Sequence, residues 1–226
     1  MKKTLIFDLD GTLLDTLKDL QNSVNFALKS FSFTAKSLEE VKKSVGNGLR
    51  MLICGCLPNG SDDKTVDAVL FKMKEYYRQH CHDETKPYDG VPELLECLRA
   101  EGYHMAIVSN KAAPMARELH RVFFLQTIAV SVGETESMKR KPAPDMVFEA
   151  LQQLKADITD AIYIGDSEVD IQTANNAGLP CLCVGWGFRS EEALRQAGAK
   201  AVYHTPQELY EAILSLKIVN IERFIM

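Results

Sequence analysis

The stretch Leu5-Ile6-Phe7-Asp8-Leu9-Asp10-Gly11-Thr12-Leu13-Leu14, near the N-terminus, decides the fold. A short apolar run ends in two carboxylates, Asp8 and Asp10, and a glycine and a threonine follow at once. Such a run, bounded by a turn residue, predicts a strand that is buried on both faces. Parallel α/β sheets bind ligands beyond the carboxyl ends of their strands, which is where this acidic pair would lie. Because two close carboxylates repel each other, we expect a cation or a shared proton beside them.

Composition and charge limit the function classes open to this chain. Its 226 residues suffice for one large domain, or for a core domain with a smaller companion. An apolar fraction of 46% and a charged fraction of 25% are ordinary for a soluble globular enzyme. The formal charge of −5 argues against broad nucleic-acid binding, because affinity for a phosphate backbone needs a basic face.

The chain shows neither a membrane span nor a secretory signal in its sequence pattern. No apolar run is long enough to cross a bilayer. The first apolar run is interrupted by Asp8 and Asp10, which argues against a signal peptide. We therefore expect a cytoplasmic protein, a monomer or a homodimer, that binds neither membranes nor nucleic acid.

The six cysteines lack the spacing of a metal site. Cys54 and Cys56 are separated by one residue, as are Cys181 and Cys183, whereas zinc knuckles usually have two to four between their ligands. We expect reduced thiols that act mainly as small apolar side chains.

The order of the predicted elements divides the chain into two parts. Between residues 15 and 85, apolar residues fall at helical spacing and we predict no strand. Ser37 and Glu40 have the spacing of a capping box, and Gly46-Asn47-Gly48 interrupts the helical pattern. From residue 86 onward strands alternate with helices, which implies right-handed βαβ units and a parallel sheet. The strands are predicted over 105–108, 127–132, 161–164, 181–184 and 201–203.

We therefore predict an α/β fold with a doubly wound parallel sheet. This Rossmann-like core would comprise residues 1–14 and 86–226. Residues 15–85 would form an all-helical cap domain, inserted after the first strand and placed beside the edge of the sheet that carries the site.

Four predicted strands end next to reactive side chains. Because parallel strands place these ends on one edge, the side chains should converge there. Carboxylates are oxygen ligands that suit a hard cation such as Mg²⁺. A lysine, a serine hydroxyl and backbone N–H groups near Gly11 and Asn110 suit phosphate oxygens. Together these groups describe a phosphoryl-transfer site, and they are Asp8 and Asp10, Ser109 and Asn110, Lys141, and Asp166 and Asp170.

Each of these residues also has an ordinary structural interpretation when it is taken alone. Ser109 is suited to a helix N-cap, and Lys141 follows two other basic residues. Asp166 and Asp170 are typical of a solvated helix start. The functional interpretation rests on finding all of them together at successive strand ends.

Four segments resemble, in order and in spacing, the motifs of the haloacid dehalogenase superfamily. They are Asp8-Leu9-Asp10-Gly11-Thr12, Ser109-Asn110, Lys141-Pro142 and Gly165-Asp166-Ser167-Glu168-Val169-Asp170. The block from 15 to 85 resembles the helical cap of the first cap class of that superfamily.

The resemblance implies a role for each matching residue. Asp8 would attack phosphorus to form an aspartyl-phosphate, and Asp10 would protonate the leaving oxygen and then activate water. Lys141 would bind the phosphoryl group and restrain Asp8, and Asp8, the Asp10 carbonyl and Asp166 would hold Mg²⁺, with Asp170 as a further ligand or just behind. The substrate-binding residues would be Gly11, Thr12, Ser109 and Asn110.

The cap suggests a substrate class. Gly46-Asn47-Gly48-Leu49-Arg50, together with Lys111, resembles the phosphoglycolate phosphatase branch of the superfamily. We therefore expect a Mg²⁺-dependent phosphatase that acts on a small phosphorylated metabolite, with 2-phosphoglycolate as the candidate. Arg50 would bind the leaving-group carboxylate bidentately, and the alternative is a surface arginine beside a helix break.

Other functions fit the same machinery. A sugar phosphomutase would return the phosphoryl group to a bound sugar phosphate, and a pyrophosphatase would cleave pyrophosphate. A non-catalytic signalling module, phosphorylated on aspartate, is disfavoured by Asp10 and by the helical insertion. The apolar C-terminal stretch 218–226 fits either core packing or an oligomer contact.

Overall fold

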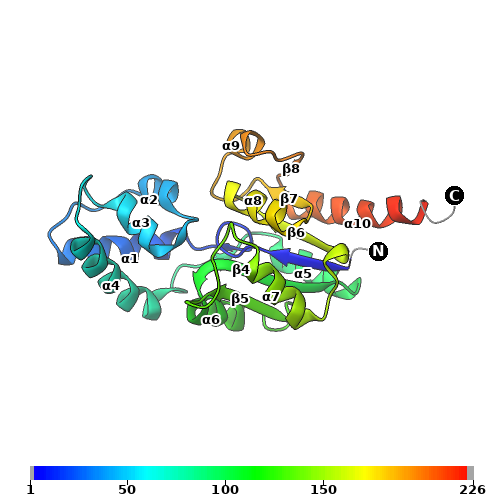
Figure 1. Cartoon of the computed structure of the whole chain (residues 1–226), viewed down its shortest axis with the longest axis horizontal. Coiled ribbons are helices and arrows are strands. Elements are labelled where there is room, and N and C mark those ends of the chain that lie inside the picture. Colours follow the sequence, from blue (N-terminus) through cyan, green and yellow to red (C-terminus); the bar gives the residue numbers. More distant parts are fainter. Residues whose placement is uncertain (1–2, 223–226) are drawn as a thin grey trace.

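The computed structural model describes residues 3–222 and contains a six-stranded parallel sheet (Figure 1). The strand order is β5-β4-β1-β6-β7-β8. Strand β1 pairs with β4 on one side and with β6 on the other, so the order of the strands reverses at β1. The carboxyl end of β1 therefore faces the crevice where such sheets bind ligands. The strands are β1 (Thr4–Phe7), β4 (His104–Ala112), β5 (Val130–Glu134), β6 (Ala161–Gly165), β7 (Cys181–Val184) and β8 (Val202–Tyr203).

Both faces of the sheet are covered by helices, because successive strand residues point to opposite faces. Phe7 belongs to the larger apolar cluster, which also contains side chains of α5 (Val91–Ala100), α6 (Ala113–Phe123) and α10 (Pro206–Glu222). Ile6 belongs to the cluster on the other face, with α7 (Asp145–Leu154) and α8 (Glu168–Ala177). The short helices η1 (Ile158–Asp160) and α9 (Glu191–Gln196) complete the core. The doubly wound α/β fold predicted from the sequence is confirmed.

A group of helices lies at one end of the molecule, beside the carboxyl edge of the sheet (Figure 1). They are α1 (Leu17–Ser30), α2 (Leu38–Ser44), α3 (Gly48–Cys56) and α4 (Asp63–His80), and we call them the cap. The chain enters and leaves the cap through two short antiparallel strands, β2 (Leu14–Asp15) and β3 (Lys86–Pro87). The predicted capping box of Ser37 and Glu40 opens α2, and the predicted break separates α2 from α3.

Some element bounds differ from the sequence predictions. The strand expected from residue 127 begins only at Val130, because Thr127 and Ile128 donate hydrogen bonds to the Phe124 carbonyl in a turn after α6. Strand β4 continues past residue 108 to Ala112, with a register shift between Ser109 and Ala112. The structure does not describe the side chains from residue 217 on, nor any part of residues 223–226. The prediction that the apolar stretch 218–226 packs on the core or forms an oligomer contact concerns these side chains. None of the described helices is long and apolar enough to span a bilayer.

Candidate active site

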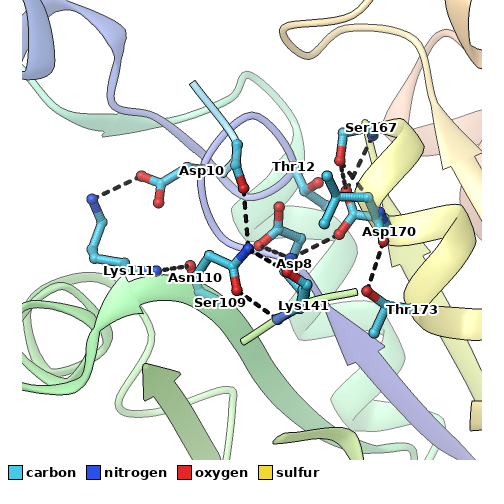
Figure 2. Close-up of polar contacts among 12 residues, drawn as sticks. Asp8, Asp10, Thr12, Ser109, Asn110, Lys111, Lys141, Ser167, Asp170 and Thr173 are labelled. Carbon is cyan, nitrogen blue, oxygen red and sulfur yellow. Dashed lines mark hydrogen bonds and ion pairs between the residues drawn. The ribbon is translucent and has the colours of Figure 1, made fainter. Parts of the chain in front are cut away.

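Asp8 follows β1 directly and lies beside a buried ammonium group (Figure 2). Its Oδ1 is 2.8 Å from Nζ of Lys141, which reaches in from the loop after β5. The same Nζ lies 2.8 Å from Oδ1 of Asp170 and 3.2 Å from the hydroxyl of Tyr163. Lys141 is 3% exposed and Asp8 8%, so this charge pairing takes place almost entirely out of water. Within residues 3–222 no donor contacts Oδ2 of Asp8, which is therefore available for chemistry.

Two further carboxylates follow β6. Asp166 accepts a hydrogen bond from the Thr12 hydroxyl on Oδ1 and one from the Phe188 N–H on Oδ2, at 3.1 and 2.7 Å. Asp170, in the first turn of α8, accepts from the N–H and hydroxyl of Ser167 on Oδ2, which completes a capping box. One oxygen of each of Asp8, Asp166 and Asp170 lies within 4.8 Å of the others.

The electrostatics of this cluster favour a bound cation. Burial, and then the charge of Asp170, raise the pKa of Asp166 to about 7. Burial and the charge of Asp170 also raise the pKa of Asp8, and the opposing attraction of Lys141 does not offset them. Three buried carboxylates therefore carry more negative charge than one ammonium neutralises. Their oxygens are the donor type that Mg²⁺ prefers, so the residues present fit this ion.

Close packing around Asp166 depends on two glycines. Gly11 has a φ of +92°, and a Cβ there would lie 2.4 Å from Oδ2 of Asp166. A Cβ on Gly187 would lie 2.3 Å from the Gly11 carbonyl oxygen. Both positions therefore need a residue without a side chain, because larger residues would push the carboxylate away.

Asp10 lies in the turn after β1, on the opposite side of Asp8 from Asp170 (Figure 2). Its Oδ1 accepts from the Thr16 hydroxyl at 2.6 Å and from Nζ of Lys111 at 3.0 Å. Nζ of Lys111 also lies 2.5 Å from the hydroxyl of Tyr77, which belongs to α4 of the cap. Burial alone would lower the pKa of Lys111, but the Asp10 charge and the Tyr77 hydroxyl raise it overall, so the ammonium stays charged.

Ser109 and Asn110 end the regular part of β4. Ser109 is 1% exposed, and its hydroxyl oxygen accepts from the N–H of Lys111 at 3.1 Å. The Asn110 amide accepts from the N–H of Lys141 and donates to the carbonyls of Lys141 and Gly46. Asn110 thereby connects two loops of the core with a loop of the cap.

A small cavity of about 50 Å³ opens between these groups and the cap. The core side of the cavity is formed by Asp8, Asp10, residues 109–111 and Lys141. The cap side includes Gly46, Gly48 and Leu49, at the N-terminus of α3, together with apolar side chains. A phosphoryl group placed there would meet two carboxylates, two ammonium groups and a hydroxyl.

The structure brings most of the residues predicted from the sequence into this site. Asp8, Asp10, Ser109, Asn110 and Lys141 line the cavity, and Asp166 and Asp170 lie next to Asp8.

Two predicted substrate-binding residues have other partners. The N–H of Gly11 donates to the Leu14 carbonyl, and the hydroxyl of Thr12 donates to Asp166. Neither residue lines the cavity, so both support the acidic cluster from behind.

Arg50, which was predicted to bind the leaving group, does not line the Asp8 cavity. Its guanidinium lies 2.6 Å from Asp63 and 3.3 Å from Asp67, both on α4. It lines a second cavity of about 260 Å³, between α3, α4 and the ends of β4 and β5. The reason is helical geometry: Leu49 lines the Asp8 cavity, and the next residue along α3 is rotated by about 100°.

Several residues of the site were missed by sequence analysis. Tyr163 lies inside a buried strand, and Tyr77 lies on the apolar face of α4, where both match an ordinary core pattern. The N–H of Phe188 carries no side-chain signal, although the run Gly185-Trp186-Gly187-Phe188 after a strand is typical of a tight loop.

Comparisons with known proteins agree with this geometry. The family model of haloacid dehalogenase-like hydrolases matches residues 5–184. A phosphoglycolate phosphatase of Pseudomonas syringae pv. syringae is 30% identical over 96% of this chain and 81% of its own length. An N-acetylmuramic acid 6-phosphate phosphatase of Pseudomonas aeruginosa is 27% identical over 93% and 94%.

Solved structures give the same result. The crystal structure of a candidate phosphoglycolate phosphatase from Lactobacillus delbrueckii subsp. bulgaricus superimposes with a TM-score of 0.90 at 33% identity, covering 94% of this chain and 98% of that one. The match of the family model over most of the chain, the parallel sheet and the order of the motifs lead to one conclusion: the chain belongs to the haloacid dehalogenase-like hydrolases.

Proposed function

We propose that this protein is a Mg²⁺-dependent phosphatase that hydrolyses a small phosphomonoester through an aspartyl-phosphate on Asp8. One observation carries this proposal: two carboxylates, Asp8 and Asp10, line the same cavity but have different partners. Asp8 is held by Lys141 and has an oxygen that no donor among the described residues contacts, whereas Asp10 is held by Lys111 and Thr16. Two carboxylates in different environments can take different roles, one as nucleophile and the other as acid–base group.

In the first step, Oδ2 of Asp8 would attack phosphorus while the bond from phosphorus to the leaving oxygen breaks. Asp10, protonated at Oδ2, would give its proton to that oxygen, so the product leaves as an alcohol. Lys141 and the Ser109 hydroxyl would stabilise the negative charge on the transferring group.

In the second step, a water molecule would attack the phosphorus of the aspartyl-phosphate. Asp10, now ionised, would take one proton from this water as the bond from phosphorus to Asp8 breaks. Phosphate leaves, Asp8 is again a carboxylate, and Asp10 is again protonated for the next cycle.

We propose magnesium ligands from the oxygens that still have lone pairs to offer. Asp8 and Asp166 each keep unused lone pairs, whereas each oxygen of Asp170 already accepts two hydrogen bonds. Asp8 and Asp166 would therefore hold Mg²⁺, and Asp170 would orient Lys141. The family resemblance adds the carbonyl of Asp10 as a further ligand. Mg²⁺ held by these residues would supply positive charge to offset the negative charge of the phosphoryl group.

The cavity supports a small substrate, for which 2-phosphoglycolate is the candidate. Both lysines that line the cavity are already paired with carboxylates, so a carboxylate on the substrate would need a different positive partner. The N-terminus of α3, whose first N–H groups have no intrahelical partner, adjoins the cavity at Gly48 and Leu49. This helix end favours a carboxylate on the leaving group. The named activity of the relative from Pseudomonas syringae supports the same candidate.

Phosphate release tests the proposal. We expect release from 2-phosphoglycolate that requires Mg²⁺, stops with EDTA and falls by at least about a thousandfold in Asp8→Asn, which keeps the shape of the side chain but loses its charge. The panel should include a sugar phosphate, a sugar bisphosphate and pyrophosphate. Wild-type rates in Asp8→Asn would remove Asp8 as the nucleophile, and phosphate that stays on a sugar product would identify a mutase.

A further inference from the structure

We propose that Tyr77 and Lys111 are positioning residues that hold Asp10 in its working orientation only while the cap is seated on the core. Tyr77 comes from α4 of the cap and Lys111 from β4 of the core. Nζ of Lys111 contacts both Asp10 and Tyr77, so one ammonium joins the acid–base group to the cap. The inference rests on the proposed role of Asp10, and it gives Lys111 and Tyr77 a role that the sequence did not assign to them.

The contacts form a continuous buried chain. Nζ of Lys111 lies 2.5 Å from the Tyr77 hydroxyl and 3.0 Å from Oδ1 of Asp10, and it also lies 4.7 Å from the centre of the Tyr77 ring. Tyr77 is fully buried, and the Lys111 side chain is 2% exposed. A buried ammonium needs nearby acceptors, because an unpaired charge is strongly destabilised away from water. Tyr77 and Asp10 are those acceptors.

The geometry leaves one oxygen of Asp10 for chemistry. Lys111 and Thr16 both contact Oδ1, and within residues 3–222 no donor meets Oδ2. If Tyr77 moved away with the cap, Lys111 would lose an acceptor and be free to change rotamer. Asp10 would then lose one of its two fixed donors. The acid–base group is thus in place only in the closed form.

Lys111 also lines the cavity, so a direct contact with the phosphoryl group is the competing interpretation. The two interpretations differ in what they predict for the leaving group. Misplacing a general acid slows the departure of a basic alkoxide and hardly affects p-nitrophenolate, which leaves without a proton. Losing a phosphate contact slows both, because the phosphoryl group is the same in each substrate.

The experiment compares kcat/KM for 2-phosphoglycolate and for p-nitrophenyl phosphate in Tyr77→Phe, Lys111→Met and Asp10→Asn. The constant kcat/KM includes all steps up to departure of the leaving group and excludes hydrolysis of the intermediate. Tyr77→Phe keeps the ring and removes only the hydroxyl. Tyr76→Phe is the matched control, because the neighbouring ring stacks between Phe26 and His80 on the cap surface.

We expect Tyr77→Phe to lower kcat/KM for 2-phosphoglycolate about tenfold, and for p-nitrophenyl phosphate less than about threefold. Lys111→Met should show the same pattern more strongly, and Tyr76→Phe should resemble the wild type. In the Asp10→Asn background, adding Tyr77→Phe should cause no further loss, because both changes act on one group.

Equal losses on both substrates, or additive losses in the double variant, would overturn the positioning role. An inactive Asp10→Asn beside an unaffected Tyr77→Phe would overturn it as well, while leaving the proposed function intact. Wild-type activity in Asp10→Asn would instead overturn the proposed role of Asp10, and the linkage with it. The melting temperature of Tyr77→Phe, compared with Tyr76→Phe, separates these effects from a folding defect.

Discussion

At the scale of single residues, the site depends on how closely the backbone can approach Asp166. Gly11 and Gly187 bring two loops against this carboxylate, and Thr12 and Phe188 then donate to its two oxygens. The Asp8-Leu9-Asp10-Gly11-Thr12 motif therefore does more than supply two acids. Its last two residues fix a carboxylate that lies more than 150 positions away in the sequence.

A pair of glycine substitutions tests this dependence. Gly11→Ala should lower the free energy of unfolding by about 2 kcal/mol or more, because it combines a positive φ with a clash against Asp166. It should also weaken Mg²⁺ binding, measured by calorimetry. Gly60→Ala is the control, since Gly60 has a φ of +83° with no atom within 4 Å of the added Cβ. Equal destabilisation by both substitutions would show that the approach to Asp166 is unimportant.

At the scale of elements, the decisive contact lies between the cap loop 45–48 and the core. Three core side chains donate to successive carbonyls of this loop: Arg189 to Val45 at 2.7 Å, Asn110 to Gly46 at 3.1 Å and Arg140 to Asn47 at 3.3 Å. Arg189 is itself held by Glu168 at 2.9 Å. These contacts close the cap over the cavity, and the strands β2 and β3 are where the chain crosses between the two parts.

Arg189→Met tests this closure, because it keeps the aliphatic stem and removes the donors. A closed form that is populated less often reduces the apparent affinity, so KM should rise several-fold while kcat stays within about twofold. Amide hydrogen exchange in 45–48 should become faster. Arg195→Met, which removes an exposed ion pair with Glu191, should leave both KM and the hydrogen exchange of 45–48 unchanged. Unchanged exchange in Arg189→Met would contradict the closing role.

At the scale of the whole molecule, the parallel sheet brings four distant segments to one edge. This convergence could be predicted from the sequence, because each segment comes after a predicted apolar strand and parallel strands share their carboxyl edge. The strand order, with β1 between β4 and β6, is known only from the structure. The direction of Arg50 and the contact between Tyr77 and Lys111 could not be predicted. Both depend on how α3 and α4 dock on the core, and no periodicity in the chain encodes that angle.

The charge of the assembled site predicts how stability depends on pH. The pKa of Asp166 is raised to about 7, whereas an unfolded aspartate titrates near about 4. A raised pKa means that the fold favours the neutral carboxyl. Its contribution to stability is complete below about pH 4 and is lost as the pH rises through 7. Mg²⁺ would replace the lost proton and neutralise the cluster.

We therefore expect Mg²⁺ to raise the melting temperature more at pH 8 than at pH 5, relative to EDTA. Differential scanning calorimetry at the two pH values measures this difference. Asp166→Asn should abolish most of it, since the substitution removes a titrating ligand. A larger effect of Mg²⁺ at pH 5 would contradict the proposed site.

The most direct test of the account is to identify the phosphorylated residue. Protein quenched in acid during turnover of p-nitrophenyl phosphate with Mg²⁺ is treated with borohydride, which reduces an acyl phosphate to an alcohol. Peptide mass spectrometry should then find homoserine at position 8, with more of it in Asp10→Asn, where the intermediate lacks its base. Continued phosphate release without modification at position 8, or modification at another carboxylate, would contradict nucleophilic attack by Asp8.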